Sequence, residues 1–266
     1  MAAPQDFAAR YGRWALIAGA SEGLGAAFAR EAARRGLDVV LVARRADALE
    51  VVGKEIEESE GRAVRCIALD LARGDAAQVL EEKLAELEIG LVVYNAALSP
   101  IGSFLELPLD EQLRAVDVNV RGPVAMAHGF GRRLAQRGRG GIVLLSSLTA
   151  FQGSPFVATY GATKSFALSL AEALWLELAP AGIDVLAVCA GATRTPAYLR
   201  RSGSGAPGEL EPDQVAREAF DRLSHGPFMI PGRFNRIASW AMRRLLPRRM
   251  TIRIMGAQTR KLTRSS

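Results

Sequence analysis

Residues 14–25 read WALIAGASEGLG and join an apolar run, a glycine-rich turn and the start of a helical pattern. The apolar run at 14–18 predicts a short buried strand, and residues 24–35 predict a helix. Between them, Gly19, Gly23 and Gly25 let the backbone turn tightly and approach a bound group closely. Because the first turn of a helix offers unpaired N–H groups, this stretch predicts a binding site for phosphates.

The rest of the chain repeats this alternation of apolar runs and helical patterns. Further strands are predicted at 37–43, 63–69, 90–94, 142–146, 183–189 and 227–230, and helices at 46–60, 75–88, 109–137, 158–179 and 212–224. Such an order predicts a parallel sheet with right-handed crossovers and helices on both faces. We therefore expect an α/β fold, a single domain built on a doubly wound parallel sheet of about seven strands.

Length and composition fit this expectation and exclude several classes of site. The 266 residues suit one domain, and 49% of them are hydrophobic. Cys66 and Cys189 each lie in an apolar run, which predicts buried free thiols and a reducing compartment, the cytoplasm. With only two histidines, we expect no metal site and no histidine triad. No apolar run approaches the roughly 18 residues of a membrane span, and the first residues do not resemble a signal peptide.

The end of the second predicted strand bears on which dinucleotide binds. NAD-binding proteins of this architecture usually place an acid there for the ribose 2′-hydroxyl, whereas a 2′-phosphate needs cations. Here Arg44 and Arg45 follow the strand, which favours NADP(H). Glu22 stands in the turn where a basic residue often assists, and it weakens this inference. Asp70 either accepts from the adenine amine or caps the segment that begins near Ala72.

A second group of residues suggests acid–base chemistry. Tyr160 and Lys164 are four residues apart on a predicted helix, so they share one face. An ammonium near a phenol lowers the phenol pKa, and such a tyrosine can exchange a proton with a carbonyl oxygen. Ser147 ends the fifth strand and competes with Ser146 for the role of holding the substrate oxygen. Asn119 is an unfavourable residue within a helix, so a polar role or a surface position is expected.

Taken together and in order, these motifs resemble the short-chain dehydrogenase/reductase family over about residues 12–232. The matching stretches are GASEGLG at 19–25, YNAA at 94–97, YGATK at 160–164 and AGATRT at 190–195, with Asp70, Asn119 and Ser147. The resemblance implies a Rossmann fold and an oxidoreductase. It implies four catalytic residues: Tyr160 as acid/base, Lys164 on the nicotinamide ribose, Ser147 on the substrate and Asn119 on a relay water.

The same resemblance implies the cofactor site. Its members here are Gly19, Ser21, Glu22, Gly23, Leu24, Gly25, Arg44, Arg45, Asp70, Leu71, Asn95, Ala96, Tyr160, Lys164, Gly191, Thr193 and Thr195. Two departures stand out, because Ala97 replaces the last glycine of the family's N-N-A-G and Ala190 replaces the proline of its Pro-Gly. Neither touches the proposed chemistry.

Within the family, the chain resembles hydroxysteroid dehydrogenase and ketoacyl reductase members. This implies that NADP(H) converts a bulky apolar ketone into a secondary alcohol or the reverse, in a homodimer or homotetramer that uses the helix at 158–179. The alternatives are a non-catalytic cofactor-binding or scaffold protein, and an epimerase or dehydratase of the same superfamily. No motif for nucleic acid is present.

We expect a domain at 1–232 with a substrate loop at about 192–211, whose SGSGAPG at 202–208 suggests a lid, and a basic extension at 233–266. From residue 222 onward there are 11 Lys or Arg and no acid, whereas the first 221 residues carry a net charge of −5. An apolar stripe runs through the extension at Phe234, Ile237, Ala238, Ala241 and Leu245. Three interpretations stay open: a solvated helix packed on the body or a second subunit, a helix on anionic lipid, or a dock for an acidic partner.

Overall fold

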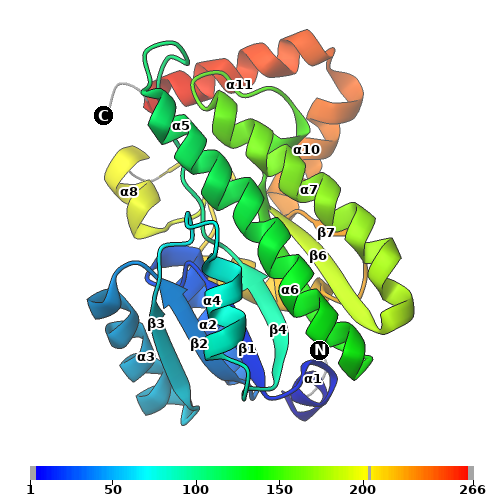
Figure 1. The fold of residues 1–266 in the computed structure, drawn as a ribbon. Helices are drawn as coiled ribbons and strands as arrows, with labels where there is room; N and C mark the ends of the chain where they lie inside the picture. Colours follow the sequence, from blue (N-terminus) through cyan, green and yellow to red (C-terminus); the bar gives the residue numbers. More distant parts are fainter. Residues whose placement is uncertain (1–3, 203–204, 263–266) are drawn as a thin grey trace.

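The computed structural model describes residues 4–202 and 205–262, and a seven-stranded parallel sheet forms its centre (Figure 1). The strand order is β3-β2-β1-β4-β5-β6-β7. The strands are β1 Trp14–Ala18, β2 Asp38–Ala43, β3 Val64–Ala68, β4 Ile89–Tyr94, β5 Gly140–Ser147, β6 Ile183–Ala190 and β7 Phe228–Met229. The order in which successive strands are added reverses between β1 and β4. Ligands of such folds bind at this switch point, beyond the carboxyl ends of the strands. The predicted fold class is confirmed.

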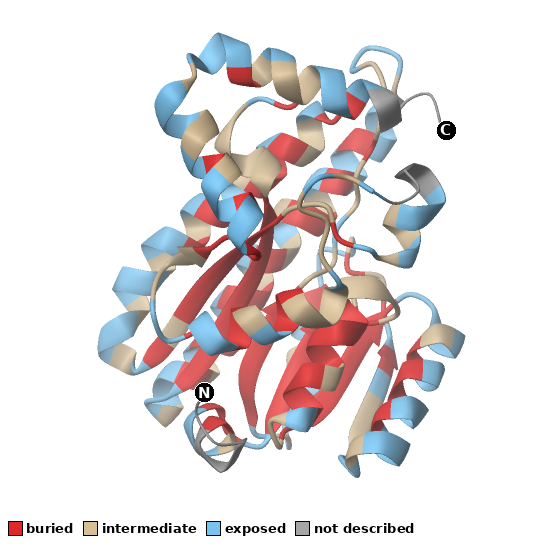
Figure 2. Cartoon of the chain, turned by 180° about the vertical axis from the view of Figure 1, so that it is seen from behind, coloured by how far each residue is buried: buried red, intermediate tan, exposed pale blue. Residues whose placement is uncertain are grey.

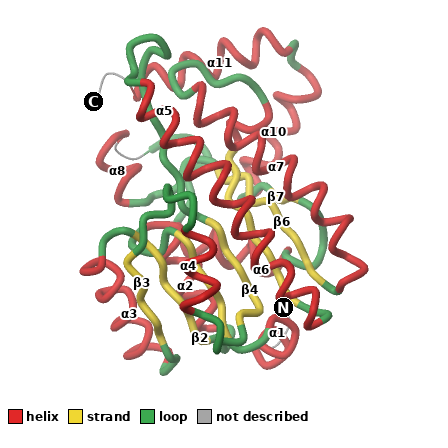
Figure 3. The backbone as a smooth tube through the Cα atoms, viewed as in Figure 1, coloured by secondary structure: helices red, strands yellow, loops and turns green. Residues whose placement is uncertain are grey.

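Helices cover both faces of the sheet, as Figures 1 and 3 show. One hydrophobic core packs α2 Gly23–Arg34, α3 Ala46–Glu60 and α9 Pro212–Arg222 on the sheet. The other packs α4 Ala76–Lys83, α6 Gly122–Arg137 and α7 Ala158–Leu178, with α5 Leu109–Val116 leading into α6. Every residue of β1, β2 and β4 is buried, which explains their continuous apolar sequence.

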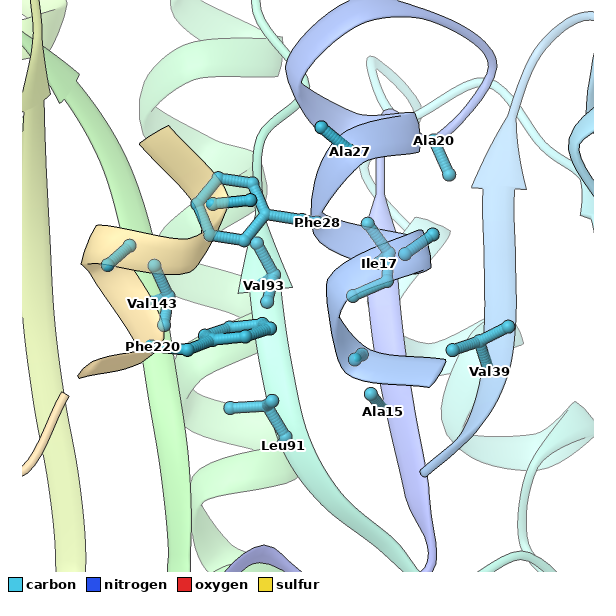
Figure 4. Close-up of a cluster of buried hydrophobic side chains, with 14 of the residues drawn as sticks. Ala15, Ile17, Ala20, Ala27, Phe28, Val39, Leu91, Val93, Val143 and Phe220 are labelled. Carbon is cyan, nitrogen blue, oxygen red and sulfur yellow. The ribbon is translucent and has the colours of Figure 1, made fainter. Parts of the chain in front are cut away.

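Close packing in the first core positions the glycine-rich turn. Phe28 of α2 meets Phe220 of α9 edge to face, with ring centroids 5.3 Å apart, above Val93 of β4 (Figure 4). Alanines such as Ala15 and Ala27 let α2 lie close to β1. The N-terminus of α2 is thereby held beside the carboxyl end of β1.

The chain also contains helices that the sequence analysis did not predict. The first, α1 Pro4–Tyr11, is tied to β6, because Arg10 and Tyr11 both donate to the Asp184 carboxylate, over 2.7–2.9 Å. The second, α8 Pro196–Ser202, lies in the predicted substrate loop, and residues 203–204 of the predicted lid fall outside the described part of the chain. The predicted helix at 75–88 ends early, at Lys83.

One expectation about a buried thiol is wrong, and one about a long helix needs refinement. Cys66 is exposed, so its prediction as a buried thiol is wrong, whereas Cys189 is buried. Cys66 lies on β3 at the edge of the sheet, where only one residue of the strand is buried. The predicted helix at 109–137 is continuous, but it contains a π-helical segment, Asp117–Arg121, between α5 and α6.

The basic extension forms two helices, α10 Arg233–Leu245 and α11 Arg248–Leu262, which lie beyond the carboxyl ends of the strands (Figure 1). Their surfaces are largely exposed or half-buried, unlike the strands (Figure 2). Thr259 of α11 is buried and donates to the Pro155 carbonyl over 2.6 Å, so α11 rests on the segment between β5 and α7. Within the described residues, we find no helix with the length and apolar character needed to cross a bilayer.

Candidate active site

Tyr160 and Ser147 meet at the carboxyl end of β5. Ser147 is the last residue of the strand, and its hydroxyl lies near enough to the Tyr160 side chain to lower the pKa of the phenol. The neighbouring Ser146 points the other way and donates to the Lys164 carbonyl over 2.8 Å. The alternation of side chains along β5 therefore brings Ser147, rather than Ser146, to the tyrosine.

Lys164 lies one helical turn after Tyr160 and is almost fully buried. Its Nζ donates to the Leu145 carbonyl over 2.6 Å and lies 5.5 Å from the centre of the Tyr160 ring. Burial disfavours the ammonium and lowers the pKa of Lys164 to about 8. Lys164 is therefore a cation at neutral pH that loses its charge in the mildly alkaline range.

The pKa of Tyr160 differs from the sequence-based expectation. Burial raises it above the ordinary value of 10, and the hydrogen bond from Ser147 lowers it by less. The ammonium of Lys164 is not among the causes of the shift. In this structure, Tyr160 is thus a neutral phenol at physiological pH, able to donate a proton rather than accept one.

Asn119 is buried in the π-helical segment and both ends of its amide are engaged. Its Nδ2 donates to the Leu98 carbonyl over 2.8 Å and to the Thr163 hydroxyl over 3.0 Å, and its Oδ1 accepts from the Leu98 N–H. Of the two expectations, a polar role and a surface position, the first fits. Asn119 joins the loop after β4 to α7 and so positions the helix that carries Tyr160.

The glycine-rich turn fits a phosphate site. A Cβ on Gly25 would lie 1.9 Å from the Gly19 carbonyl oxygen, so the turn can close only without side chains there. Asn95 donates to the same carbonyl over 2.9 Å, and Ala96 packs against Gly19. The first residues of α2, including Leu24, begin without a side-chain cap from Glu22. The N–H groups of this helix start are thus available to an anion.

A cluster of charged side chains lies where the 2′-phosphate was predicted. Arg45 donates to the Ser21 hydroxyl over 3.2 Å and pairs with Glu22 at 3.1 Å. The second oxygen of Glu22 pairs with Arg200 of α8, also at 3.1 Å. Partial burial raises the pKa of Glu22, but the hydrogen bonds from the two arginines outweigh it and hold the pKa below its ordinary value. Arg200 could not be predicted as a member of this cluster, because nothing in its local sequence links it to residue 22.

Both carboxylate oxygens of Asp70 are hydrogen-bonded within the protein. One oxygen accepts from the Ala72 N–H over 3.1 Å and the other from Arg114 over 2.6 Å. Although partial burial raises its pKa, these bonds and the charge of exposed Arg44 keep the pKa low. Asp70 and Arg114 also line a shallow hollow of about 350 Å³. Leu71 next to it is buried. Capping of the segment near Ala72 is thus observed, whereas the contact with an adenine stays a prediction.

The segment after β6 touches the glycine-rich turn. Gly191 packs on Leu148 and Asn235, and Thr193, which is buried, donates to the Gly191 carbonyl over 3.1 Å. A Cβ on Gly23 would lie 2.9 Å from the Thr195 side chain, so the start of α8 lies directly against the turn. The predicted cofactor residues thus gather from β1, β2, β4 and β6 at one end of the sheet.

A hollow of about 590 Å³ lies between α11 and the segment that precedes α7, and none of Ser147, Tyr160 and Lys164 lines it. Its lining combines an apolar part with two arginines: Pro155, Phe156, Ile252, Arg253, Gly256, Ala257 and Arg260. This hollow could not be predicted from the sequence, because its lining joins residues 155–156 to residues 252–260, about 100 positions further along the chain. Among the described residues, no cluster of His, Cys, Asp or Glu has the composition of a metal site.

Comparison with known proteins agrees with the geometry. The model of the short chain dehydrogenase family matches residues 13–202. The chain belongs to this family. It is an oxidoreductase of the short-chain dehydrogenase type, and the fold and motifs above are those of the family.

Three relatives show where within the family the similarity is high. The 7β-hydroxysteroid dehydrogenase of Clostridium sardiniense is 32% identical over 234 residues, which cover 87% of this chain and 90% of the relative. A solved 7β-hydroxysteroid dehydrogenase superimposes with a TM-score of 0.88 at 32% identity, covering 94% of this chain and 98% of its own. A short-chain dehydrogenase from Sphingobium yanoikuyae in complex with NADPH has a TM-score of 0.77 at 33% identity, with coverages of 86% and 92%.

Proposed function

We propose that this short-chain dehydrogenase uses NADP(H) to interconvert a bulky apolar ketone and its secondary alcohol. The observation that carries the proposal is the proximity of Ser147 and Tyr160 at the carboxyl end of β5, with Lys164 buried one turn further along the same helix and 5.5 Å from the Tyr160 ring. The epimerase or dehydratase and the non-catalytic scaffold are not favoured.

In the proposed reaction, the protein's own residues bind, orient and supply a proton. The nicotinamide, when bound, exchanges a hydride with the substrate carbon. Ser147 orients the carbonyl oxygen, and Tyr160 donates its phenolic proton to that oxygen during reduction. Lys164 holds the nicotinamide ribose, and Asn119 keeps α7 in place. The raised pKa of Tyr160 ensures that the proton is present at neutral pH.

The preference for NADP(H) rests on Arg44 and Arg45 after β2. Both are exposed at the end of the strand, and Arg45 lies within hydrogen-bond distance of the glycine-rich turn through Ser21. Guanidinium groups match a phosphate with paired hydrogen bonds. The NADPH complex of the Sphingobium relative supports this choice.

The substrate class rests on the cavity under α11. Pro155, Phe156, Ile252 and Ala257 give it an apolar lining, and a volume of about 590 Å³ suits a drug-sized or steroid-sized molecule. The two 7β-hydroxysteroid dehydrogenases support a steroid, and the resemblance to ketoacyl reductases makes a ketoacyl chain the second choice.

We also propose that the chain forms a homodimer or homotetramer through α5, α6 and α7. The continuous helix formed by α5 and α6 runs beside α7 on one face of the molecule (Figure 1). Their exposed large apolar side chains are Leu109, Leu113, Val116, Val124, Phe166, Trp175 and Leu176. Seven exposed large apolar side chains on these helices are typical of a subunit interface. The cytoplasmic location stays a prediction.

The test is a fluorescence titration with NADPH and NADH, followed by turnover on ketosteroids, 3-ketoacyl thioesters and short polar ketones. We expect tighter binding of NADPH, turnover of a bulky ketone, and loss of turnover in Tyr160→Phe with NADPH binding retained. Turnover of only short polar ketones would refute the substrate class. A Tyr160→Phe variant with full activity would refute the catalytic assignment.

A further inference from the structure

Helix α10 is turned so that Asn235 and Ser239 face the protein, while its large apolar side chains face outward. Asn235 and Ser239 are only 4% and 8% exposed. Asn235 donates to the carbonyls of Gly208 and Pro231, over 2.9 and 3.2 Å, and these bonds fix the rotation of the helix. The result is the reverse of an ordinary surface helix, whose apolar stripe faces the core.

The outward surface of α10 carries four large apolar side chains, which we call the α10 outer face. Their exposed fractions are 56% for Phe234, 66% for Ile237, 59% for Trp240 and 66% for Leu245. Phe234, Ile237 and Trp240 follow one another at intervals of three residues, and Leu245 lies on the same side of the helix about two turns after Ile237. A contiguous apolar row held outward by hydrogen bonds marks an interaction surface.

Positive charge surrounds the α10 outer face. Arg233 and Arg244 stand four residues before Ile237 and four after Trp240, so they lie on the same side of the helix. Both are exposed, as are Arg248 and Arg249 at the start of α11. No acidic residue follows Asp221 in the sequence. The partner must therefore bring negative charge together with an apolar layer.

A second copy of the chain does not meet this requirement. In a twofold interface the same patch contacts itself, so the arginines of one copy would approach those of the other. An anionic lipid surface does meet it, since phosphate headgroups lie above an apolar layer. Trp, Phe and Leu on one face with Arg beside them is the composition of helices that lie in a membrane interface.

We propose that α10 binds the surface of an anionic membrane, with Phe234, Ile237, Trp240 and Leu245 inserted at the headgroup boundary and Arg233 and Arg244 on lipid phosphates. Helices α10 and α11 lie at the end of the molecule where α7 begins (Figure 1), and α11 lines the hollow of about 590 Å³. An apolar substrate dissolved in the lipid would then be delivered close to the cavity. This last consequence rests on the proposed function, whereas membrane binding does not.

Co-sedimentation of the full chain with vesicles tests the proposal. We expect the protein to pellet with vesicles of equimolar phosphatidylcholine and phosphatidylglycerol, and not with phosphatidylcholine alone. The double variant Arg233→Gln, Arg244→Gln should lower the partition coefficient roughly thirtyfold, at about fivefold per arginine near an anionic surface. Ile237→Ser with Leu245→Ser should lower it by more than about tenfold.

The matched control is Val51→Ser, which removes an apolar side chain that is 69% exposed on α3, and it should pellet like the wild type. Thermal unfolding shows whether each variant remains folded, and size-exclusion chromatography without lipid reports its oligomeric state. No pelleting of the wild type, or pelleting of both double variants equal to that of the wild type, would overturn the proposal. If Ile237→Ser with Leu245→Ser dissociated an oligomer, membrane binding would be overturned, and the α10 outer face would instead bind a second copy of the chain. The co-sedimentation assay contains no nucleotide and no substrate. Its results would therefore be unaffected if the proposed enzymatic function failed.

Discussion

Replacing Glu22 by glutamine is expected to tighten the binding of NADPH and to leave the binding of NADH unchanged. In the structure, the Glu22 carboxylate holds Arg45 at 3.1 Å on one oxygen and Arg200 at 3.1 Å on the other. A 2′-phosphate in the proposed site would compete with this carboxylate for Arg45. Glutamine keeps the shape of the side chain and removes the competing charge.

The magnitude follows from the exposure of the pair. The side chains of Glu22 and Arg45 are 31% and 53% exposed, and ion pairs with such access to solvent contribute about 0.2–1 kcal/mol. Releasing Arg45 from this pair should therefore lower the Kd for NADPH by about 1.4- to 5-fold. The opposite change, Arg45→Gln, removes a charge-assisted hydrogen bond worth about 1.5–3 kcal/mol and should raise the Kd about 10- to 150-fold.

The assay is a fluorescence titration of both nucleotides at two ionic strengths. The gain for NADPH in Glu22→Gln should shrink at high salt, because exposed charges are screened. Glu50→Gln, an exposed acid on α3, is the matched control and should change neither affinity. Weaker NADPH binding in Glu22→Gln, or an equal shift for NADH, would show that Glu22 does not compete for the phosphate-binding cation.

Three further changes test the site and the core. Lys164→Met should abolish turnover yet unfold no earlier than the wild type at pH 7, because it removes a buried ammonium; a large drop in Tm would contradict this. Gly25→Ala should abolish NADPH binding, since its Cβ would lie 1.9 Å from a backbone oxygen, and unchanged affinity would refute the close packing. Phe28→Ala should cost about 3–5 kcal/mol and lower Tm by roughly 6–20 °C, measured by calorimetry, because the ring is fully buried.

The sheet could be predicted from sequence because its strands are buried on both faces. Such strands have continuous apolar runs, and the predicted strand at 14–18 agrees with β1 residue for residue. The same reasoning failed at Cys66, because an apolar run does not show that its strand lies at the sheet edge. Helix α1 was missed since its contacts, such as Tyr11 with Asp184, join residues 173 positions apart.

In the candidate site too, contacts set by local periodicity were predictable and contacts between distant segments were not. The proximity of Tyr160, Ser147 and Lys164 was predictable. Helical periodicity places Tyr160 and Lys164 on one face of α7, and Ser147 ends β5, the strand that precedes this helix. Arg200 was not, since it meets Glu22 from 178 residues away. For α10, periodicity predicted the apolar stripe, but the direction it faces depends on hydrogen bonds from Asn235 to a distant loop.

Burial in this site acts in opposite directions on the two titrating side chains. The charged form of tyrosine is the base and that of lysine is the acid, so desolvation raises the pKa of Tyr160 and lowers that of Lys164 to about 8. Below pH 8 the site therefore holds a neutral phenol and an ammonium. Ketone reduction needs that phenolic proton, whereas alcohol oxidation needs Tyr160 to lose it first. The rate of reduction should accordingly be highest at neutral pH and that of oxidation should rise with pH, even though the equilibrium itself is set by the reactants.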